Sequence, residues 1–312
     1  MATMPDAQQF TPQLTELTDG LRFPEGPIAM SDGSIVLVEM FGPRLTRVAP
    51  DGTHSTIAEI EGGPNGAAVG PDGAFYLCNN GGCFAPAEFG GMMFPGAFVP
   101  ERYIGGRIQR VDPHDGSVTD LYTECDGRPL RAPNDLVMDG HGGFWFTDHG
   151  KRRARDEDRG GLYYARPDGS AVTKPVPGLL GANGVGLSPD GGTVYVAESY
   201  TGRLLAWDLD GPGQIAGGGG PGHGGRCVVA TPAGFDSLAV EADGHVVVAA
   251  ITHGLCVVDP LSGDHEFLEM PDPLVTNICF TGDDHRTAYI TMSGVGWLGE
   301  ATWPRPGLPL NF

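Results

Sequence analysis

The sequence lacks several features that would assign it to common classes of protein. No run of about 18 apolar residues occurs, so no membrane-spanning helix is expected. No segment shows a sustained helical spacing of apolar residues, which argues against a helical fold. The first 20 residues have neither a basic start nor an apolar centre, so we expect no secretory signal and predict a cytoplasmic protein with reduced thiols.

Basic residues are also scarce. The chain of 312 residues carries 19 Lys and Arg against 39 Asp and Glu, which gives a formal net charge of −20. Such a surface repels phosphate backbones, so nucleic acid is not an expected partner. The acidic excess has two interpretations at this point, because carboxylates serve solubility and also attract divalent cations.

Motifs of several enzyme and repeat families are missing. Six cysteines are present, but only Cys78 and Cys83 are close, and their stretch CNNGGC lacks the ligand spacing of a zinc site. No Gly-x-Ser-x-Gly motif occurs, which argues against a serine hydrolase. A single Trp-Asp pair, at Trp207 and Asp208, excludes a WD40 array.

Glycine and proline are abundant, by contrast. The 51 Gly and 27 Pro make up a quarter of the chain, while apolar residues still account for 40%. The sequence shows no collagen-like period, and its apolar content argues against disorder. We therefore expect an all-β fold with many tight turns, forming one domain over residues 1–312.

Six similar hairpins run along the chain. In each, a polar residue precedes a short apolar strand, a turn rich in Asp and Gly, and a second β-rich strand. The polar residues stand 40 to 69 positions apart, which fits a blade of four strands and predicts a six-bladed β-propeller. They are Glu25, Asn65, Asn134, Asn183, Asp236 and Asn277.

The first strand of each propeller blade lines the central channel, so these six side chains are expected to converge at the top of that channel. All six offer oxygen atoms, and two are anionic. Oxygen ligands without Cys or His suit Ca²⁺, with Mg²⁺, Mn²⁺ or Zn²⁺ as alternatives. Asn and Asp before a strand also cap turns, but Glu is a poor turn residue, so Glu25 favours a site for one divalent cation.

The second strand of each hairpin returns to the same mouth, so its last residues are expected to form a second ring. His149 is the member best suited to proton transfer near neutral pH, unless it is a surface loop histidine. Arg131, three residues before Asn134, is placed to reach a substrate oxygen, unless it is a solvated loop residue. The whole second ring consists of Glu39-Met40, Asn79-Asn80, Asp148-His149, Glu198-Ser199, Thr252-His253 and Ser293.

At these residues, from about Leu21 to Ser293, the sequence resembles the SMP-30/gluconolactonase/LRE family, also called regucalcin-like. The most specific motifs are PEGP, PNDLVMD, ANGVGLSPDG and FDSLAVEADG. The resemblance implies a six-bladed propeller with one divalent ion, commonly Ca²⁺, held by Glu25, Asn183 and Asp236. It makes Asn134 a further ligand or a substrate contact, and it gives Asn65, which we place among the substrate contacts, no firm role.

Two segments lie outside the repeats, besides an N-terminal stretch (14–23) that is expected to supply the outer strand closing the ring. Residues 81–105, rich in Phe, Met, Gly and Pro, predict a lid or a pocket wall for an apolar substrate, with a loop packed on a blade as the alternative. Residues 294–312 are expected to form a C-terminal tail packed on the propeller.

These features predict a metal-dependent lactonase that acts on a small-molecule lactone of apolar character. Polarisation of the carbonyl by the cation and attack of water would open the ring, with Asp236 as general base and His149 in reserve. The alternatives are a phosphotriesterase or arylesterase at the same site, a non-catalytic calcium-binding propeller, and a strictosidine-synthase-like condensing enzyme, which should lack this Glu/Asn/Asp set. Nothing in the sequence indicates an oligomeric state.

Overall fold

The computed structural model describes residues 10–220 and 225–312. Within these residues the chain forms strands and turns and contains no helix. The described part of the chain accordingly offers no helix that is long and apolar enough to cross a membrane.

Four-stranded antiparallel sheets follow one another along the chain, and each is one blade. The first three blades are formed by β2 (Pro24–Ala29), β3 (Ile35–Glu39), β4 (Arg44–Val48) and β5 (His54–Glu59); by β6 (Pro64–Val69), β7 (Phe75–Asn79), β10 (Arg107–Val111) and β11 (Val118–Tyr122); and by β14 (Pro133–Met138), β15 (Phe144–Arg152), β16 (Glu157–Ala165) and β17 (Val172–Leu179).

The second half of the chain repeats this plan. Its three blades are formed by β18 (Ala182–Leu187), β19 (Thr193–Glu198), β20 (Arg203–Gly211) and β22 (Arg226–Ala230), with β21 (Gln214–Ile215) added to β20; by β23 (Gly234–Val240), β24 (Val246–Ile251), β25 (Gly254–Val258) and β26 (His265–Leu268); and by β27 (Val275–Thr281), β28 (Thr287–Met292), β29 (Trp297–Thr302) and β1 (Thr15–Thr18).

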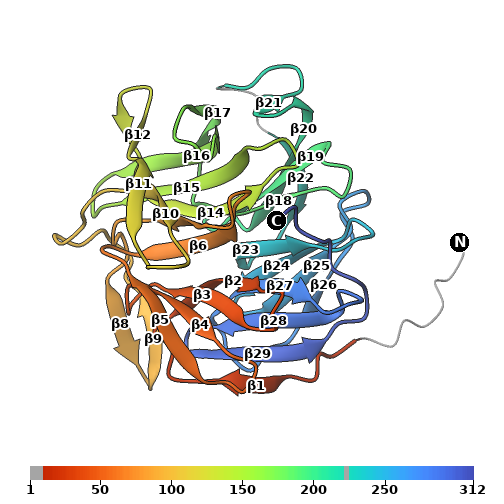
Figure 1. The fold of residues 1–312 in the computed structure, drawn as a ribbon. Helices are drawn as coiled ribbons and strands as arrows, with labels where there is room; N and C mark the ends of the chain where they lie inside the picture. The colour runs from red at the N-terminus through yellow and green to blue at the C-terminus, as the bar shows by residue number, and fades with distance from the viewer. Residues whose placement is uncertain (1–9, 221–224) are drawn as a thin grey trace, which may run out of the picture.

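The blades close into a ring. The first strands of neighbouring blades contact one another all the way around, β27 and β2 included, and Figure 1 shows the sheets arranged around a common centre. The N-terminal strand β1 pairs with β29, so strands from both ends of the chain complete the sixth blade. The predicted six-bladed propeller and the predicted closing strand are both confirmed.

Apolar side chains fill the space between blades. In β3 every residue is buried, because neighbouring blades cover both faces of the sheet, which explains its continuous run IVLV. Val36 and Val38 of this strand pack in one cluster with Phe75 and Leu77 of the second blade. Burying each such side chain stabilises the fold by about 1.5–3 kcal/mol.

A register shift recurs in the first strand pair of every blade. In five blades it falls at the polar residue that the sequence singles out, for example between Glu25 and Ile28 and between Ala182 and Val185. In the sixth blade it falls at Thr276, between Val275 and Asn277. Bulges of this kind redirect a side chain, here toward the channel axis. The next residue is often glycine, and a Cβ on Gly66 would lie 2.6 Å from the carbonyl oxygen of Asn134 in the neighbouring blade.

Residues 81–105 form a small hairpin, β8 (Pro86–Phe89) and β9 (Met92–Pro95), that reaches beyond its own blade. The Met93 amide donates to the carbonyl oxygen of Gly294 at 2.8 Å, and the Val99 amide donates to that of Arg152 at 2.9 Å. The segment therefore bridges the second blade to the sixth and the third.

The C-terminal segment divides into two parts. Within residues 294–312, Trp297–Thr302 are β29 of the sixth blade, and the chain crosses the propeller only from Trp303 onward. The Leu308 amide donates to the carbonyl oxygen of Val240, and the Asn311 side chain donates to that of Met138, both at 2.9 Å. In Figure 1 the C-terminus accordingly lies near the middle of the ring.

Candidate metal and substrate site

The side chains of the predicted inner ring lie in the channel wall. Five of them are buried, and Asp236 keeps a partly accessible surface. Glu25 from the first blade and Asp236 from the fifth are close enough for their charges to interact, and Asn183 hydrogen-bonds to Asp236. The fold thus brings together the three residues that the family resemblance proposes as core ligands.

Two ring atoms are buried without any hydrogen-bond partner in the described protein. They are Oε2 of Glu25 and Oδ1 of Asn134. Leaving such oxygens unpaired costs free energy, so buried polar atoms are nearly always satisfied in folded proteins. Both are hard oxygen donors on first strands of their blades, so these residues fit a divalent cation.

The electrostatics of the ring also fit a cation. Burial, with the neighbouring charges of Asp236 and Asp135, raises the pKa of Glu25 well above its usual range. Burial, with the charge of Asp135, raises the pKa of Asp236 to about 7 despite its hydrogen bond from Asn183. A cation at this point would favour the ionised form of both groups.

Asp135 is a third carboxyl in this region, and sequence reasoning assigned it no function. It is buried, burial raises its pKa to about 7, and its Oδ1 accepts the amide of Leu136 at 2.9 Å. One signal pointed to it: at the equivalent position three other blades have glycine, Gly26, Gly66 and Gly184, so a charged residue there is unusual.

The amides of Asn65 and Asn134 form a small network. Oδ1 of Asn65 accepts from Nδ2 of Asn80 at 3.2 Å and from Nδ2 of Asn134 at 3.5 Å. The Asn134 amide therefore turns its nitrogen toward Asn65 and leaves its oxygen free. The prediction that Asn277 belongs to the ring is wrong, because the bulge of the sixth blade falls at Thr276. Asn277 is one residue farther along β27, where its Oδ1 accepts the amide of Ile278 at 2.8 Å.

The second ring differs from its prediction at four positions. There the first residue of the pair turns away from the mouth and accepts a backbone N–H of the segment that enters the same blade. The bonds join Glu39 to Arg22 at 2.7 Å, Asn79 to Gly63 at 3.0 Å, Asp148 to Arg131 at 2.7 Å and Glu198 to Leu180 at 2.7 Å. These amides lie outside the strand ladders, so a side chain has to satisfy them.

The following residue of the pair is the one near the inner ring. Besides Asn80, which reaches Asn65, the hydroxyl of Ser199 accepts from Nδ2 of Asn183 at 3.1 Å. The hydroxyl of Ser293 likewise lies 2.5 Å from that of Thr276, which holds the ring position in the sixth blade. Among the predicted members, the second ring therefore consists of Met40, Asn80, His149, Ser199 and Ser293. The prediction of Thr252 and His253 is wrong, because both are exposed in the turn between β24 and β25.

His149 is a buried residue of the mouth, so the surface-loop alternative is wrong. Its ring lies edge-on between Phe84, at 5.4 Å between ring centroids, and Tyr200, at 5.0 Å. Burial lowers the pKa of His149 to about 4, so the imidazole is neutral at neutral pH. A Cβ on Gly181, two residues before Asn183, would lie 3.1 Å from its Nε2.

The side chain of Arg131 forms an ion pair with the third blade. Its Nε lies 3.4 Å from Oδ2 of Asp158 on β16, and about a third of its side chain is exposed. Its carbonyl oxygen accepts the hydroxyl of Tyr103 at 2.5 Å, so its backbone is tied to residues 81–105. A substrate contact by Arg131 stays a prediction, and that contact has to compete with the ion pair.

Residues 81–105 build a wall at the mouth. Met93 packs with Phe23 and Met40 of the first blade and with Leu274 of the sixth. Phe84 contacts His149 of the third blade. The segment therefore lies against several blades beside the ring, which is the position that a pocket wall requires.

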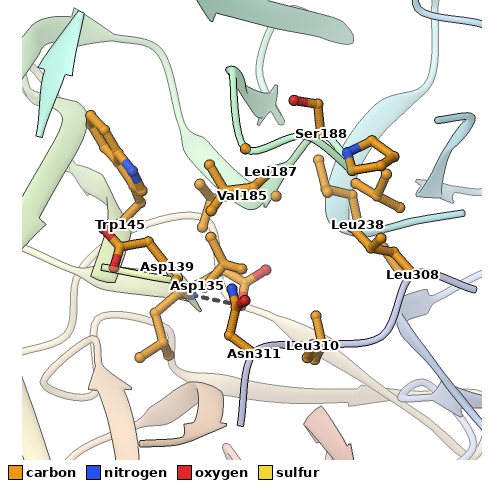
Figure 2. A pocket seen from close by; sticks show the side chains of 18 of the residues that line it. Asp135, Asp139, Trp145, Val185, Leu187, Ser188, Leu238, Leu308, Leu310 and Asn311 are labelled. Atoms are coloured by element: carbon orange, nitrogen blue, oxygen red, sulfur yellow. Dashed lines mark hydrogen bonds between the residues drawn. The ribbon is translucent and has the colours of Figure 1, made fainter. Parts of the chain in front are cut away.

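A cavity of about 490 Å³ occupies the other end of the channel. It begins beneath the ring at Gly26 and Asp135 and ends at the C-terminal tail, whose residues Leu308 and Asn311 line it, as Figure 2 shows. The tail thus closes the channel on the side opposite His149.

A second acidic group lies at the turn of the fifth blade. Glu241, Asp243 and His245 have potential ligand atoms within 4.8 Å of one another. The carboxylate of Glu241 already accepts Nε1 of Trp303 at 2.5 Å and pairs with Arg305. A cation would have to displace these contacts, so the channel ring is the better candidate.

A six-bladed propeller with a ring of carboxylates and amides defines the class of protein. The chain belongs to the SMP-30/gluconolactonase/LRE-like family, whose model matches residues 23–294. The family resemblance found in the sequence is therefore confirmed.

Curated relatives match part of this chain. The protein named lactonase drp35 of Staphylococcus haemolyticus is 30% identical over 210 residues, which are 65% of this chain and 55% of that protein. The Arabidopsis thaliana protein named strictosidine synthase-like 3 is 32% identical over 166 residues, which are 50% of this chain and 40% of that protein. The chain spans about half the length of the curated relatives it matches.

Among solved structures, a calcium-binding protein of Agrobacterium tumefaciens, named regucalcin, has the same fold. It superposes with a TM-score of 0.72 at 18% identity, over 96% of this chain and 98% of that one.

Proposed function

We propose that this chain is a metal-dependent hydrolase of cyclic esters, with one divalent cation held by Glu25, Asn134, Asn183 and Asp236. The observation that carries the proposal is the pair of buried oxygens without partners, Oε2 of Glu25 and Oδ1 of Asn134, in a ring of mutually repelling carboxyls. Support for the reaction comes from the family and from the relative named lactonase. The oxygen-only ligand set favours Ca²⁺, and one fold neighbour is named as calcium-binding.

When bound, the cation would polarise the lactone carbonyl and stabilise the negative charge that develops on its oxygen. Asp236 is our candidate for the general base that takes the proton from the attacking water. It is partly accessible, whereas Glu25 is fully buried, and Asn183 orients it by a hydrogen bond. The neutral imidazole of His149 offers a second proton acceptor, weaker because burial lowers its pKa to about 4.

The mouth supports a substrate with apolar character. Phe84, Met93 and His149 present ring and thioether surfaces beside the channel entrance. Such side chains favour an alkyl or aryl substituent over a fully hydroxylated sugar ring. We therefore expect the best substrate to be a lactone that carries an apolar group.

The metal ligands are tested by Glu25→Gln and Asp236→Asn, with Asp243→Asn as the matched control from the other acidic group. We expect both ring variants to lose Ca²⁺ binding in calorimetry and to lose hydrolysis of every lactone in a panel. The control should keep both properties. Loss of the ion in the Asp243→Asn variant alone would move the site to the fifth-blade turn.

Measuring which substrates the protein turns over distinguishes a lactonase from the alternative functions. Aryl esters and phosphotriesters join the lactone panel, because the same cation could polarise their oxygens. Metal binding without turnover of any of these would indicate a non-catalytic binding protein. A condensing enzyme, as the name of the second relative suggests, would keep its activity after the ion is removed with a chelator.

A further inference from the structure

A series of aromatic contacts beside the channel ring leads to the guanidinium group of an arginine. The series Phe84, His149 and Tyr200 continues to Arg152, whose Cζ lies 5.4 Å from the centroid of the Tyr200 ring. Phe84 comes from residues 81–105, His149 and Arg152 from β15, and Tyr200 from the turn after β19. Arg152 is exposed and Tyr200 is 44% exposed, so a ligand at the mouth can reach both.

This wall stands directly beside a proposed metal ligand. Tyr200 follows Ser199, whose hydroxyl accepts from the Asn183 side chain. Gly181 lies beneath both rings, since a Cβ there would be 3.1 Å from Nε2 of His149 and 3.1 Å from Cδ2 of Tyr200. The stack is therefore fixed on the segment that leads into β18 and Asn183.

Arg152, like Arg155 and Arg159 of the same hairpin, takes part in none of the ion pairs found in residues 10–220 and 225–312. Arg131 and Arg153, in contrast, both pair with Asp158. Glu157 stands opposite Arg152 in the strand ladder and is exposed without such a pair. The Arg152 carbonyl accepts the Val99 amide at 2.9 Å, which fixes its backbone while the guanidinium lies over the Tyr200 ring.

The charge of the whole molecule makes this position unusual. The chain carries a formal net charge of −20, and the ring itself contains carboxyl groups. An anionic ligand is repelled almost everywhere on such a surface, so an unpaired guanidinium at the mouth would select where it binds. A planar guanidinium fits a carboxylate by two parallel hydrogen bonds, which a lysine does not offer.

We propose that Arg152, backed by Tyr200, recognises an anionic substituent, so that the substrate is a lactone whose apolar part is followed by a carboxylate arm. The inference rests on the proposed lactonase function, because it names the substrate class of that site. Phe84 and His149 contact the apolar part, and Arg152 binds the carboxylate farther from the cation.

The test uses a matched pair of substrates: a γ-lactone with a carboxyalkyl arm and its methyl ester. We expect the wild-type protein to prefer the free carboxylate, and Arg152→Gln to raise its KM at least about tenfold while kcat and the KM of the ester stay unchanged. Arg152→Lys should recover part of the preference. Raising the salt concentration to about 0.5 M should reduce it.

Arg155→Gln is the control, because it removes the same charge from the exposed tip of the same hairpin. An equal effect of both variants, or an equal effect of Arg152→Gln on both substrates, would overturn the inference and leave the lactonase proposal standing. A wild-type preference for the ester would also overturn it. Absence of any lactone turnover would refute the proposed function and this substrate class together.

Discussion

Glu25, Asp135 and Asp236 come from three different blades and interact through their charges in one buried region. Burial raises the pKa of each, and neighbouring carboxylates add to the rise for Glu25 and Asp236, so the folded chain without metal retains protons that the unfolded chain has already released. Above the ordinary carboxyl pKa near 4, a rise in pH therefore favours the unfolded chain, up to the raised values near 7. A bound cation reverses this balance by favouring the ionised groups.

At the residue scale we predict that Asp135→Asn stabilises the metal-free protein at pH 8. Burial raises the pKa of Asp135 from its ordinary value of 3.8 to about 7, which sets an upper bound of about 4 kcal/mol on the gain. The gain should shrink to roughly 1–2 kcal/mol at pH 5, where the unfolded chain is still ionised, and disappear below the ordinary carboxyl pKa near 4. Urea unfolding at the two pH values in the presence of a chelator measures it.

The pH dependence separates this cause from simple repacking. Asp139→Asn is a suitable comparison, since Asp139 is also buried but accepts hydrogen bonds from Tyr164, His141 and Gly143. That variant should be less stable at both pH values. A gain for Asp135→Asn that is the same at pH 5 and pH 8 would contradict the electrostatic explanation.

At the scale of the element, the hairpins were predictable and the bulges within them were not. Asp-Gly turns and β-rich strands mark each hairpin in the sequence, and the polar residue at a fixed offset marks the channel end. Whether Glu39 or Met40 faces the mouth depends on the register shift opposite Glu25, which leaves no compositional trace. The second-ring prediction therefore failed for Glu39 and Asp148, whose carboxylates bind backbone amides.

Extensions of two strands beyond the predicted hairpin were also missed. The strands β15 and β16 have nine residues each, and the end of β15 that carries the wall residue Arg152 lies past the predicted strand, which ends at His149. The strand β29 was assigned to the tail because two tryptophans and three prolines hide its pattern. In both cases pairing with a distant strand, rather than local propensity, decides the structure.

Close contact between first strands gives a second prediction. Gly66→Ala would place a Cβ 2.6 Å from the Asn134 carbonyl oxygen and 2.8 Å from Oδ1 of Asp135. We expect a loss of roughly 1–3 kcal/mol or more in unfolding free energy, and weaker ion binding because Asn134 is displaced. Thermal unfolding and calorimetry with Ca²⁺ measure the two effects.

The control for this substitution is Gly140→Ala. The nearest atom to its added Cβ is Oδ1 of Asn311 at 3.5 Å, an ordinary contact, and neither glycine has a left-handed backbone. Its stability and ion affinity should stay close to wild type. Equal losses in both variants would show that the crossing of first strands is not what makes Gly66 necessary.

On the scale of the whole molecule, the ring depends on its closing strand. Deleting residues 1–18 removes β1, its pairing with β29, and the packing of Leu17 against the cluster between the sixth and first blades. We expect a lower unfolding temperature, a broader transition and loss of the ion, because Glu25 is held in the first blade beside this seam. Calorimetric melting with and without Ca²⁺ measures the unfolding temperature, the breadth of the transition and the stabilisation by the ion.

Truncation after Gly307 offers the comparison. It removes residues 308–312, whose hydrogen bonds are to Val240 and Met138, and it leaves every blade complete. The ion affinity should be kept and the unfolding temperature should fall less than in the deletion of residues 1–18. The reverse order would mean that the tail, not the closing strand, holds the ring together.

Each blade contributes one residue to the ring from its own bulge, and these residues are Glu25, Asn65, Asn134, Asn183, Asp236 and, in the sixth blade, Thr276. Each of these side chains is anchored in the sheet of its own blade. A single substitution can therefore replace one oxygen-donating side chain of the ring while the other five keep their positions. A site built on one contiguous loop has no such freedom, because there each change disturbs its neighbours. On this scaffold, ion preference and substrate range can evolve by single substitutions.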